Sequence, residues 1–317
     1  MRYGLCVSLL LVLVSAKSAD AEVPRVVTDM PVTHALVSEV LGDLGEPVLL
    51  LETGADPHNF QLRPSQAGAI AAANLVVWIG PELTPWLERS LSAAPDVPAL
   101  SLLRTKGVAL RRFDEIGPDG PEGDAAELPQ PISAPHENGQ NHEGIDPHAW
   151  LDPDNAALWI GTIADALAEM DPEHAATYRA NASLAQARIA ALDENLDAAL
   201  ANARARPFIV THDALGYFAA HYGLTIAASI SSGNAATPGA AHLTELRDLL
   251  EGGGILCIFP ETGQDPKQLS ILAEGTPAKI GPALDPEGRS IAPGSKLYLG
   301  LMQGLATALV DCISGGQ

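Results

Sequence analysis

Short apolar runs alternate with longer amphipathic stretches over most of this chain of 317 residues. The runs are rich in β-branched and aliphatic residues, which predict strands, whereas the stretches between them carry apolar residues at helical spacing. Strands are expected at residues 23–28, 48–51, 75–79, 99–102, 207–211, 224–229, 255–259 and 278–280. Because strands that alternate with helices are typical of βα units around a parallel sheet, the pattern predicts an α/β protein.

A long helical stretch separates the two series of strands. It begins near Asp171, a suitable N-cap, and Pro172, a suitable first-turn residue, and it continues with few breaks to about Arg204. Roughly 30 residues at ~1.5 Å each would form a rod about 45 Å long, enough to connect two lobes. The expected organisation is an N-terminal lobe over 22–170, a linking helix over 171–205 and a C-terminal lobe over 206–317.

The periodicity is lost between residues 113 and 145, inside the first expected lobe. Eight acidic residues, many Gly and Pro, and no Lys or Arg lie between Asp114 and Glu143, so we expect an acidic mobile loop. His136 and His142 lie within it. Two interpretations remain open: the histidines are incidental in a surface insertion, or the loop is a flexible auxiliary arm that captures metal.

The first 21 residues are typical of a signal peptide. Arg2 supplies the positive start, residues 5–14 form an apolar run too short to span a membrane, and Ala19-Asp20-Ala21 matches a cleavage site. Because no cysteine follows the apolar run, a lipid anchor is not expected. The mature protein is therefore predicted to be exported and free in solution.

Net charge limits the possible partners of the protein, and cysteine usage limits the possible covalent links. The formal net charge is −21, which argues against nucleic acid and anionic membranes as partners and is compatible with cations. Cys6 leaves with the leader, so Cys257 and Cys312 remain, and in an oxidising compartment we favour one disulfide between them. The alternatives are two unrelated buried thiols or a cysteine-based metal site, for which the spacing gives little support.

Three histidines occupy similar places in the pattern. His58 follows Asp56-Pro57, His148 follows Asp146-Pro147, and His212 stands in Thr211-His212-Asp213, each after an apolar run or before a helix. Parallel α/β sheets place ligands beyond the carboxyl ends of their strands, so these imidazoles are expected to converge. Asp285, just beyond the last expected strand, is the candidate fourth ligand. Three imidazoles and one carboxylate suit tetrahedral Zn²⁺, whereas manganese and calcium favour more oxygens.

With these motifs in view, the chain resembles the zinc receptors of bacterial ABC importers, the metal-specific periplasmic solute-binding proteins of cluster A-I (ZnuA-like, TroA-like). The most specific matches are residues 54–58, 146–152, 211–218 and 284–286. The resemblance implies two (β/α)₄ lobes with parallel sheets, joined by a long rigid helix at about 172–204, with the metal site between the lobes. It assigns the ligands to His58, His148, His212 and Asp285. Manganese members carry Glu at the position of His212, so this histidine points to zinc.

The function implied is a periplasmic high-affinity Zn²⁺ receptor that delivers zinc to an ABC-type permease. The resemblance also implies a permease and ATPase in the inner membrane as partners, and for some members a periplasmic zinc metallochaperone; we expect a monomer. One alternative is a manganese receptor of the same family. Another, from a different class, is a zinc-dependent hydrolase, but the sequence has no H-E-x-x-H motif and Asp285 would close the metal shell.

Overall fold

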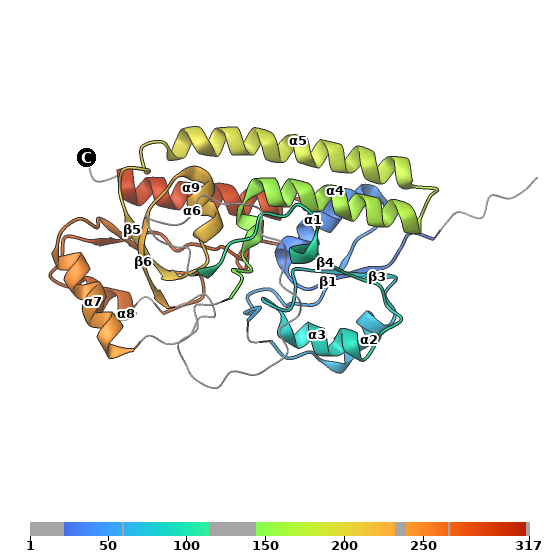
Figure 1. Ribbon diagram of the computed structural model, residues 1–317, viewed down its shortest axis with the longest axis horizontal. Helices are drawn as coiled ribbons and strands as arrows, with labels where there is room; N and C mark the ends of the chain where they lie inside the picture. The colour runs from blue at the N-terminus through green and yellow to red at the C-terminus, as the bar shows by residue number, and fades with distance from the viewer. Residues whose placement is uncertain (1–21, 59, 114–143, 232–238, 266, 315–317) are drawn as a thin grey trace, which may run out of the picture.

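The computed structural model describes residues 22–58, 60–113, 144–231, 239–265 and 267–314, and it confirms the predicted α/β class (Figure 1). Its strands form two parallel four-stranded sheets, in the order β2-β1-β3-β4 and β6-β5-β7-β8. The strands are β1 Val26–Thr28, β2 Val48–Leu49, β3 Leu75–Trp78, β4 Ala99–Ser101, β5 Phe208–His212, β6 Ile226–Ser231, β7 Cys257–Phe259 and β8 Lys279–Ile280. The helices are α1 Pro31–Leu41, α2 Pro64–Ala71, α3 Pro85–Ser92, α4 Pro153–Met170, α5 Ala175–Leu200, α6 Gly216–Tyr222, α7 Ala240–Glu251, α8 Lys267–Ala273 and α9 Leu297–Ser314.

The two sheets share one strand order, although the two halves of the sequence show no obvious repeat. In each half the first strand is flanked by the second on one side and the third on the other. This arrangement creates a switch point between the first and third strands, where parallel sheets commonly bind ligands. In the second half, His212 ends the first strand and Glu261 follows the third. In the first half, the buried Asp29 carboxylate instead accepts a hydrogen bond from the Ile79 backbone N–H at 2.9 Å.

Side chains of the central strands alternate between two apolar clusters. Val26 of β1 and Phe208 of β5 belong to one large core that extends through both halves of the molecule. Val27 faces a separate cluster that includes residues of α2 and α3, and Ile209 faces another that includes residues of α7 and α8. Each sheet is therefore covered on both faces, as parallel sheets usually are.

A layer of long helices covers both sheets on one side. α5 packs against α1 and α4 of the first half and against α6 and α9 of the second, and it runs along the length of the molecule (Figure 1). It begins at Ala175, three residues later than the expected first turn, because Asp171 accepts hydrogen bonds from His174 Nδ1 and Tyr178 Oη instead of capping the helix directly. The long connecting helix thus has lateral support from both halves.

The C-terminal helix α9 belongs to the same layer. Its length and mean hydropathy would suffice to cross a membrane, but half of its apolar window is buried, and it packs on α1 and α5 as a core helix. A disulfide joins Cys312 of α9 to Cys257 of β7, which confirms the predicted pairing. The helix is therefore fixed to its own sheet covalently and to the first half by packing.

A charged cluster ties α4, α5 and α6 together. Asp152 caps α4 by accepting a hydrogen bond from the Asp154 backbone N–H, and its carboxylate lies 3.2 Å from His221 Nδ1. Asp193 of α5 lies 2.9 Å from His221 Nε2. These two carboxylates, Asp152 first, raise the pKa of His221 to about 9.

We expect this cluster to make the stability of the metal-free protein depend on pH. Because the pKa of His221 rises from its ordinary 6.5 to about 9 on folding, its contribution is complete below about pH 6.5 and is lost as the pH rises through about 9. The shift corresponds to at most about 3–4 kcal/mol of unfolding free energy. In urea unfolding, the wild type should have a lower free energy of unfolding at pH 9.5 than at pH 6.5. The variant His221→Gln should not show this difference. The control variant His242→Gln, at an exposed side chain of α7, should lose as much stability as the wild type over this pH range. A loss of the same size in His221→Gln would contradict the assignment of the pH dependence to His221.

Candidate metal centre

The structure brings the three predicted histidines together. The ring centroids are 5.6 Å apart for His58 and His148, 5.3 Å for His58 and His212, and 5.1 Å for His148 and His212. One ligand atom from each, together with a carboxylate oxygen of Glu287, lies within 4.8 Å of the others. Ligand atoms this close can converge on one ion after small adjustments, because Zn–N and Zn–O bonds of about 2 Å place the ligand atoms of one shell roughly 3–4 Å apart.

His148 is fixed in the orientation that a metal ligand needs. It precedes the short 3₁₀ turn Ala149–Leu151, its side chain is fully buried, and its backbone N–H donates to Asp146 Oδ1 at 2.9 Å. The same oxygen lies 2.7 Å from the ring Nδ1. A neutral ring that donates Nδ1–H to Asp146 presents the Nε2 lone pair, which has no hydrogen-bond partner among the described residues.

The electrostatics of this pair favour a neutral imidazole. Burial lowers the pKa of His148 well below its ordinary value, and the neighbouring rings of His212 and His58 lower it further. Burial also raises the pKa of the Asp146 carboxyl to about 7, against the opposing effect of its hydrogen bonds. Because a histidine must be neutral to bind a metal ion, desolvation prepares His148 for this role.

His212 is held by a carboxylate of its own. It is the last residue of β5, and its Nδ1 lies 2.8 Å from Glu261 Oε2, beyond the end of the neighbouring strand β7. Both side chains are buried, so this contact sets the ring orientation and leaves Nε2 as the nitrogen not engaged by Glu261. The sequence pattern indicates the strand end but not this partner, since only the sheet order places Glu261 beside His212.

His58 is the most accessible of the three imidazoles, with 10% of its side chain exposed. It lies in the loop between β2 and α2, where its backbone N–H donates to Asp56 Oδ1 at 2.8 Å. The indole N–H of Trp86 donates to the Pro57 carbonyl at 2.8 Å and so anchors the residue before His58. Its Nε2 lies 3.4 Å from Glu287 Oε1.

The carboxylate that lies beside the imidazoles belongs to Glu287 and not to Asp285, the expected fourth ligand. The Asp285 carboxylate accepts hydrogen bonds from the backbone N–H groups of Arg289 and Ser290, each at 2.8 Å, and so closes a turn outside the imidazole group. Glu287 is 1% exposed, and its Oε2 has no hydrogen-bond partner among the described residues. Burial raises the pKa of Glu287, and the charge of Glu261 raises it further. A bound cation would offset both effects.

The auxiliary histidines His136 and His142 lie outside the described residues. A second group of possible ligands among the described residues consists of Asp152, Asp154 and His221. Both ring nitrogens of His221 already face carboxylates, and its raised pKa favours the imidazolium, which cannot coordinate a metal. We therefore interpret this second group as an ion-pair cluster.

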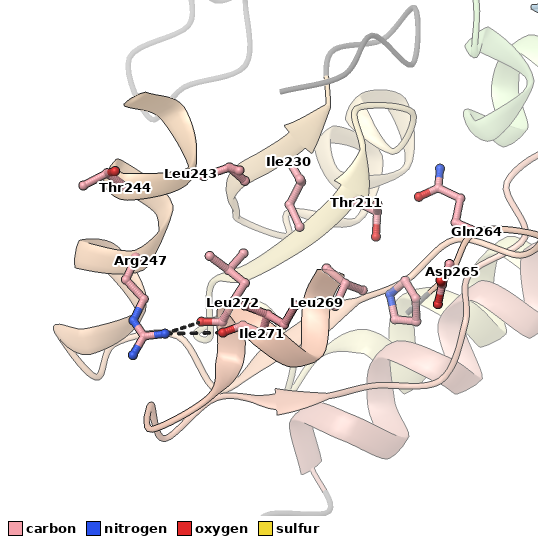
Figure 2. Close-up of a pocket in the computed structure, with 11 residues that line it drawn as sticks. Thr211, Ile230, Leu243, Thr244, Arg247, Gln264, Asp265, Leu269, Ile271 and Leu272 are labelled. Carbon is pink, nitrogen blue, oxygen red and sulfur yellow. Dashed lines mark hydrogen bonds between the residues drawn. The ribbon is translucent and has the colours of Figure 1, made fainter. Parts of the chain in front are cut away.

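A separate cavity lies elsewhere in the second half. It has a volume of about 510 Å³, and residues of β5, β6, α7 and α8 line it, mostly with apolar side chains (Figure 2). Figure 2 shows Arg247 at its edge, where the guanidinium donates to the carbonyls of Ile271 and Leu272. None of the three clustered imidazoles lines this cavity, so it does not contribute to the metal centre.

Comparisons with known proteins agree with this arrangement. A family model described as zinc-uptake complex component A, periplasmic (ZnuA) matches residues 26–312. The chain is 46% identical over 312 residues to the high-affinity zinc uptake system protein ZnuA of Paracoccus denitrificans, with 94% of each chain covered. It is 32% identical to the ZnuA protein of Brucella suis, again with 94% of each covered.

Solved structures share the fold. The laminin-binding protein (Lmb) of Streptococcus agalactiae, described as a bifunctional protein with adhesin and metal transporting activity, has a TM-score of 0.73 at 25% identity and covers 92% of this chain and 99% of its own. The protein FpvC of Pseudomonas aeruginosa, solved with Mn²⁺, has a TM-score of 0.75 at 20% identity, with 93% and 100% covered. At that identity the second likeness concerns the fold alone. From the match over residues 26–312 and the 46% identity over 312 residues, we conclude that the chain belongs to the family of periplasmic A components of zinc-uptake complexes.

Proposed function

We propose that this protein is the periplasmic receptor that binds Zn²⁺ and delivers it to an ABC-type permease. The observation that carries the proposal is the convergence of three imidazoles, two of them buried, and one buried carboxylate. The two buried rings, His148 and His212, each have Nδ1 engaged by a carboxylate. The proposed ligands are His58, His148, His212 and Glu287, the last in place of Asp285. The names of the relatives, high-affinity zinc uptake system proteins, support the same role for this chain.

The donor set supports zinc over manganese as the cargo. Three nitrogens and one carboxylate make a shell of the kind common for zinc, whereas manganese sites usually contain more oxygen ligands. The accessible edge of His58, next to a cavity of about 510 Å³ lined by Phe60, Trp86 and Arg89, offers a route for the ion. We propose that the ion enters and leaves on this side.

The proposed coordination shell supports a receptor rather than a hydrolase. A hydrolytic zinc site needs an open coordination position and a poised general base. In the proposed shell Glu287 fills the fourth position, and the Glu261 carboxylate faces His212 and Arg289. Export through residues 1–21, a monomeric state and a metallochaperone partner remain predictions, and the leader lies outside the described residues.

We expect the mature protein, residues 22–317, to bind one zinc ion tightly in chelator-competition titrations. A strain without the gene should fail to grow under zinc depletion, and the full chain should restore growth whereas a version without residues 1–21 should not. Restoration under manganese depletion, but not under zinc depletion, would instead support the manganese alternative. Zinc-dependent turnover of a test ester or peptide would favour the hydrolase.

A further inference from the structure

We infer that Arg289 is a positioning residue that ties the loop of His58 to the carboxylates of the second half and slows the release of the bound ion. This inference rests on the proposed function. Arg289 follows Glu287 by two residues, and its backbone is fixed by the Asp285 turn. Its side chain is 15% exposed, and its guanidinium points toward three groups at the metal centre.

Each nitrogen of the guanidinium faces a different partner. Nη2 donates to the Gly54 carbonyl at 3.2 Å, Nη1 lies 3.6 Å from Glu261 Oε1, and Nε lies 3.7 Å from Glu287 Oε2. The first contact is a hydrogen bond, and the other two are ion pairs without direct hydrogen-bond geometry. A planar fork with donors on three sides can make this set of contacts, whereas a lysine ammonium cannot reach all three positions.

The three partners support three of the four proposed ligands. Glu261 orients His212, Glu287 is itself a proposed ligand, and Gly54 lies in the turn closed by the Ala55 N–H and the Glu52 carbonyl, four residues before His58. Gly54 has a φ of +80°, a conformation that favours glycine, so its carbonyl direction is set by a local turn. One side chain therefore contacts the supports of ligands from both halves of the molecule.

The segment of His148 depends on other contacts with the second half. The Trp150 indole N–H donates to the Pro286 carbonyl at 2.7 Å, and the Tyr217 hydroxyl donates to the Asp146 carbonyl at 3.0 Å. Both contacts are buried and close to the ligands. The loop of His58 is more exposed, and it meets the second half through the Arg289 hydrogen bond to Gly54 and through the contact of His58 Nε2 with Glu287 at 3.4 Å. Loss of this arginine should therefore loosen His58 more than the other ligands.

The direction in which zinc release changes distinguishes a positioning role of Arg289 from a purely electrostatic one. If Arg289 acted only as a positive charge, its removal would leave a more negative site that holds a cation more strongly, and lysine would replace it fully. If it positions the loop and the carboxylates, both Arg289→Lys and Arg289→Met should release zinc faster. Contacts behind metal ligands are worth about 10-fold to 100-fold in affinity, so we expect release to accelerate by about that factor.

The test measures zinc release by stopped-flow mixing with excess chelator, together with the visible spectrum of the Co²⁺-loaded protein. We expect both variants to release zinc faster and to show altered cobalt d–d bands, since His58 no longer completes a regular shell. Arg179→Ala, which removes an exposed arginine paired with Asp165 on the outer helices, should match the wild type. Circular dichroism and urea unfolding establish that each variant is folded, and Arg289→Gln replaces any variant that is not.

The outcomes separate this inference from the proposed function. Unchanged release rates and cobalt spectra in the variants, or slower release from Arg289→Met, would overturn the positioning role while tight binding by the wild type leaves the receptor intact. Failure of the wild type to bind zinc tightly would remove the receptor proposal itself.

Discussion

Replacing Glu287 by Gln is expected to weaken zinc binding by about 10²-fold to 10³-fold. Four-ligand zinc sites are worth about 10–16 kcal/mol, so one ligand accounts for roughly 2.5–4 kcal/mol if the four contribute equally. Glutamine keeps the size of the side chain but removes the charge that would face the ion. The loss should appear as a shift in chelator-competition curves measured at a fixed pH.

Asp285→Asn is the matched control for this prediction. It removes the same charge from the same loop, two residues away, so the long-range electrostatic effect of the two variants is similar. The Asp285 carboxylate holds the Arg289 and Ser290 backbone N–H groups, and asparagine keeps one oxygen that can accept. We expect a loss of about tenfold or less. A larger loss for Asp285→Asn than for Glu287→Gln would mean that the loop rearranges on metal binding and that Asp285 is the ligand after all.

The sequence predicted the fold and the three imidazoles for a common physical reason. The spacing of apolar residues and the composition locate the strands, and the carboxyl ends of parallel strands meet at one edge of a sheet. The convergence of histidines such as His58 and His212 can therefore be predicted without any knowledge of contacts. The adjacent Asp146 and Pro147 gave a further local signal for His148. These predictions depended on residues close to one another in the sequence.

The choice between Asp285 and Glu287 as the candidate fourth ligand could not be made in this way. The loop after β8 contains Asp285 and Glu287 two residues apart, with a proline between them, and no periodicity indicates which carboxylate faces the imidazoles. In the structure, Asp285 instead accepts the backbone N–H groups of Arg289 and Ser290, and Glu287 lies beside the imidazoles. The contacts of Glu261 with His212 and of Arg289 with Gly54 join residues far apart in the chain, so a single sequence carries no signal for them.

The expected division into two lobes remains a prediction, and the packing of the core argues against fully independent lobes. A rod between independent lobes would have separate cores on either side, yet one apolar cluster includes residues of both halves together with α1, α4, α5 and α9. Relative motion of the halves would have to disturb this shared helix layer. We infer that movement on metal binding is concentrated in the ligand loops, of which the loop of His58 is the most exposed.

Removing the disulfide between Cys257 and Cys312 should lower the free energy of unfolding by about 4 kcal/mol. The two cysteines are 55 residues apart in the sequence. Closing a loop of this length restricts the unfolded chain, and the chain-entropy relation gives about 4 kcal/mol at 25 °C, within the range of about 2–5 kcal/mol measured for native bridges. The double variant Cys257→Ala/Cys312→Ala, compared with the wild type by urea unfolding in the metal-free state, measures this difference.

Reduction of the wild type supplies the control, because it breaks the same bond without changing the volume of buried Cys257. The reduced wild type and the double variant should lose similar stability, with the variant slightly less stable owing to the space left by the smaller alanine side chains. Zinc affinity should change little in either, since neither cysteine belongs to the imidazole group. A loss below about 1 kcal/mol would contradict the entropic account and would mean that the packing of α9 on α1 and α5 alone fixes the helix in place.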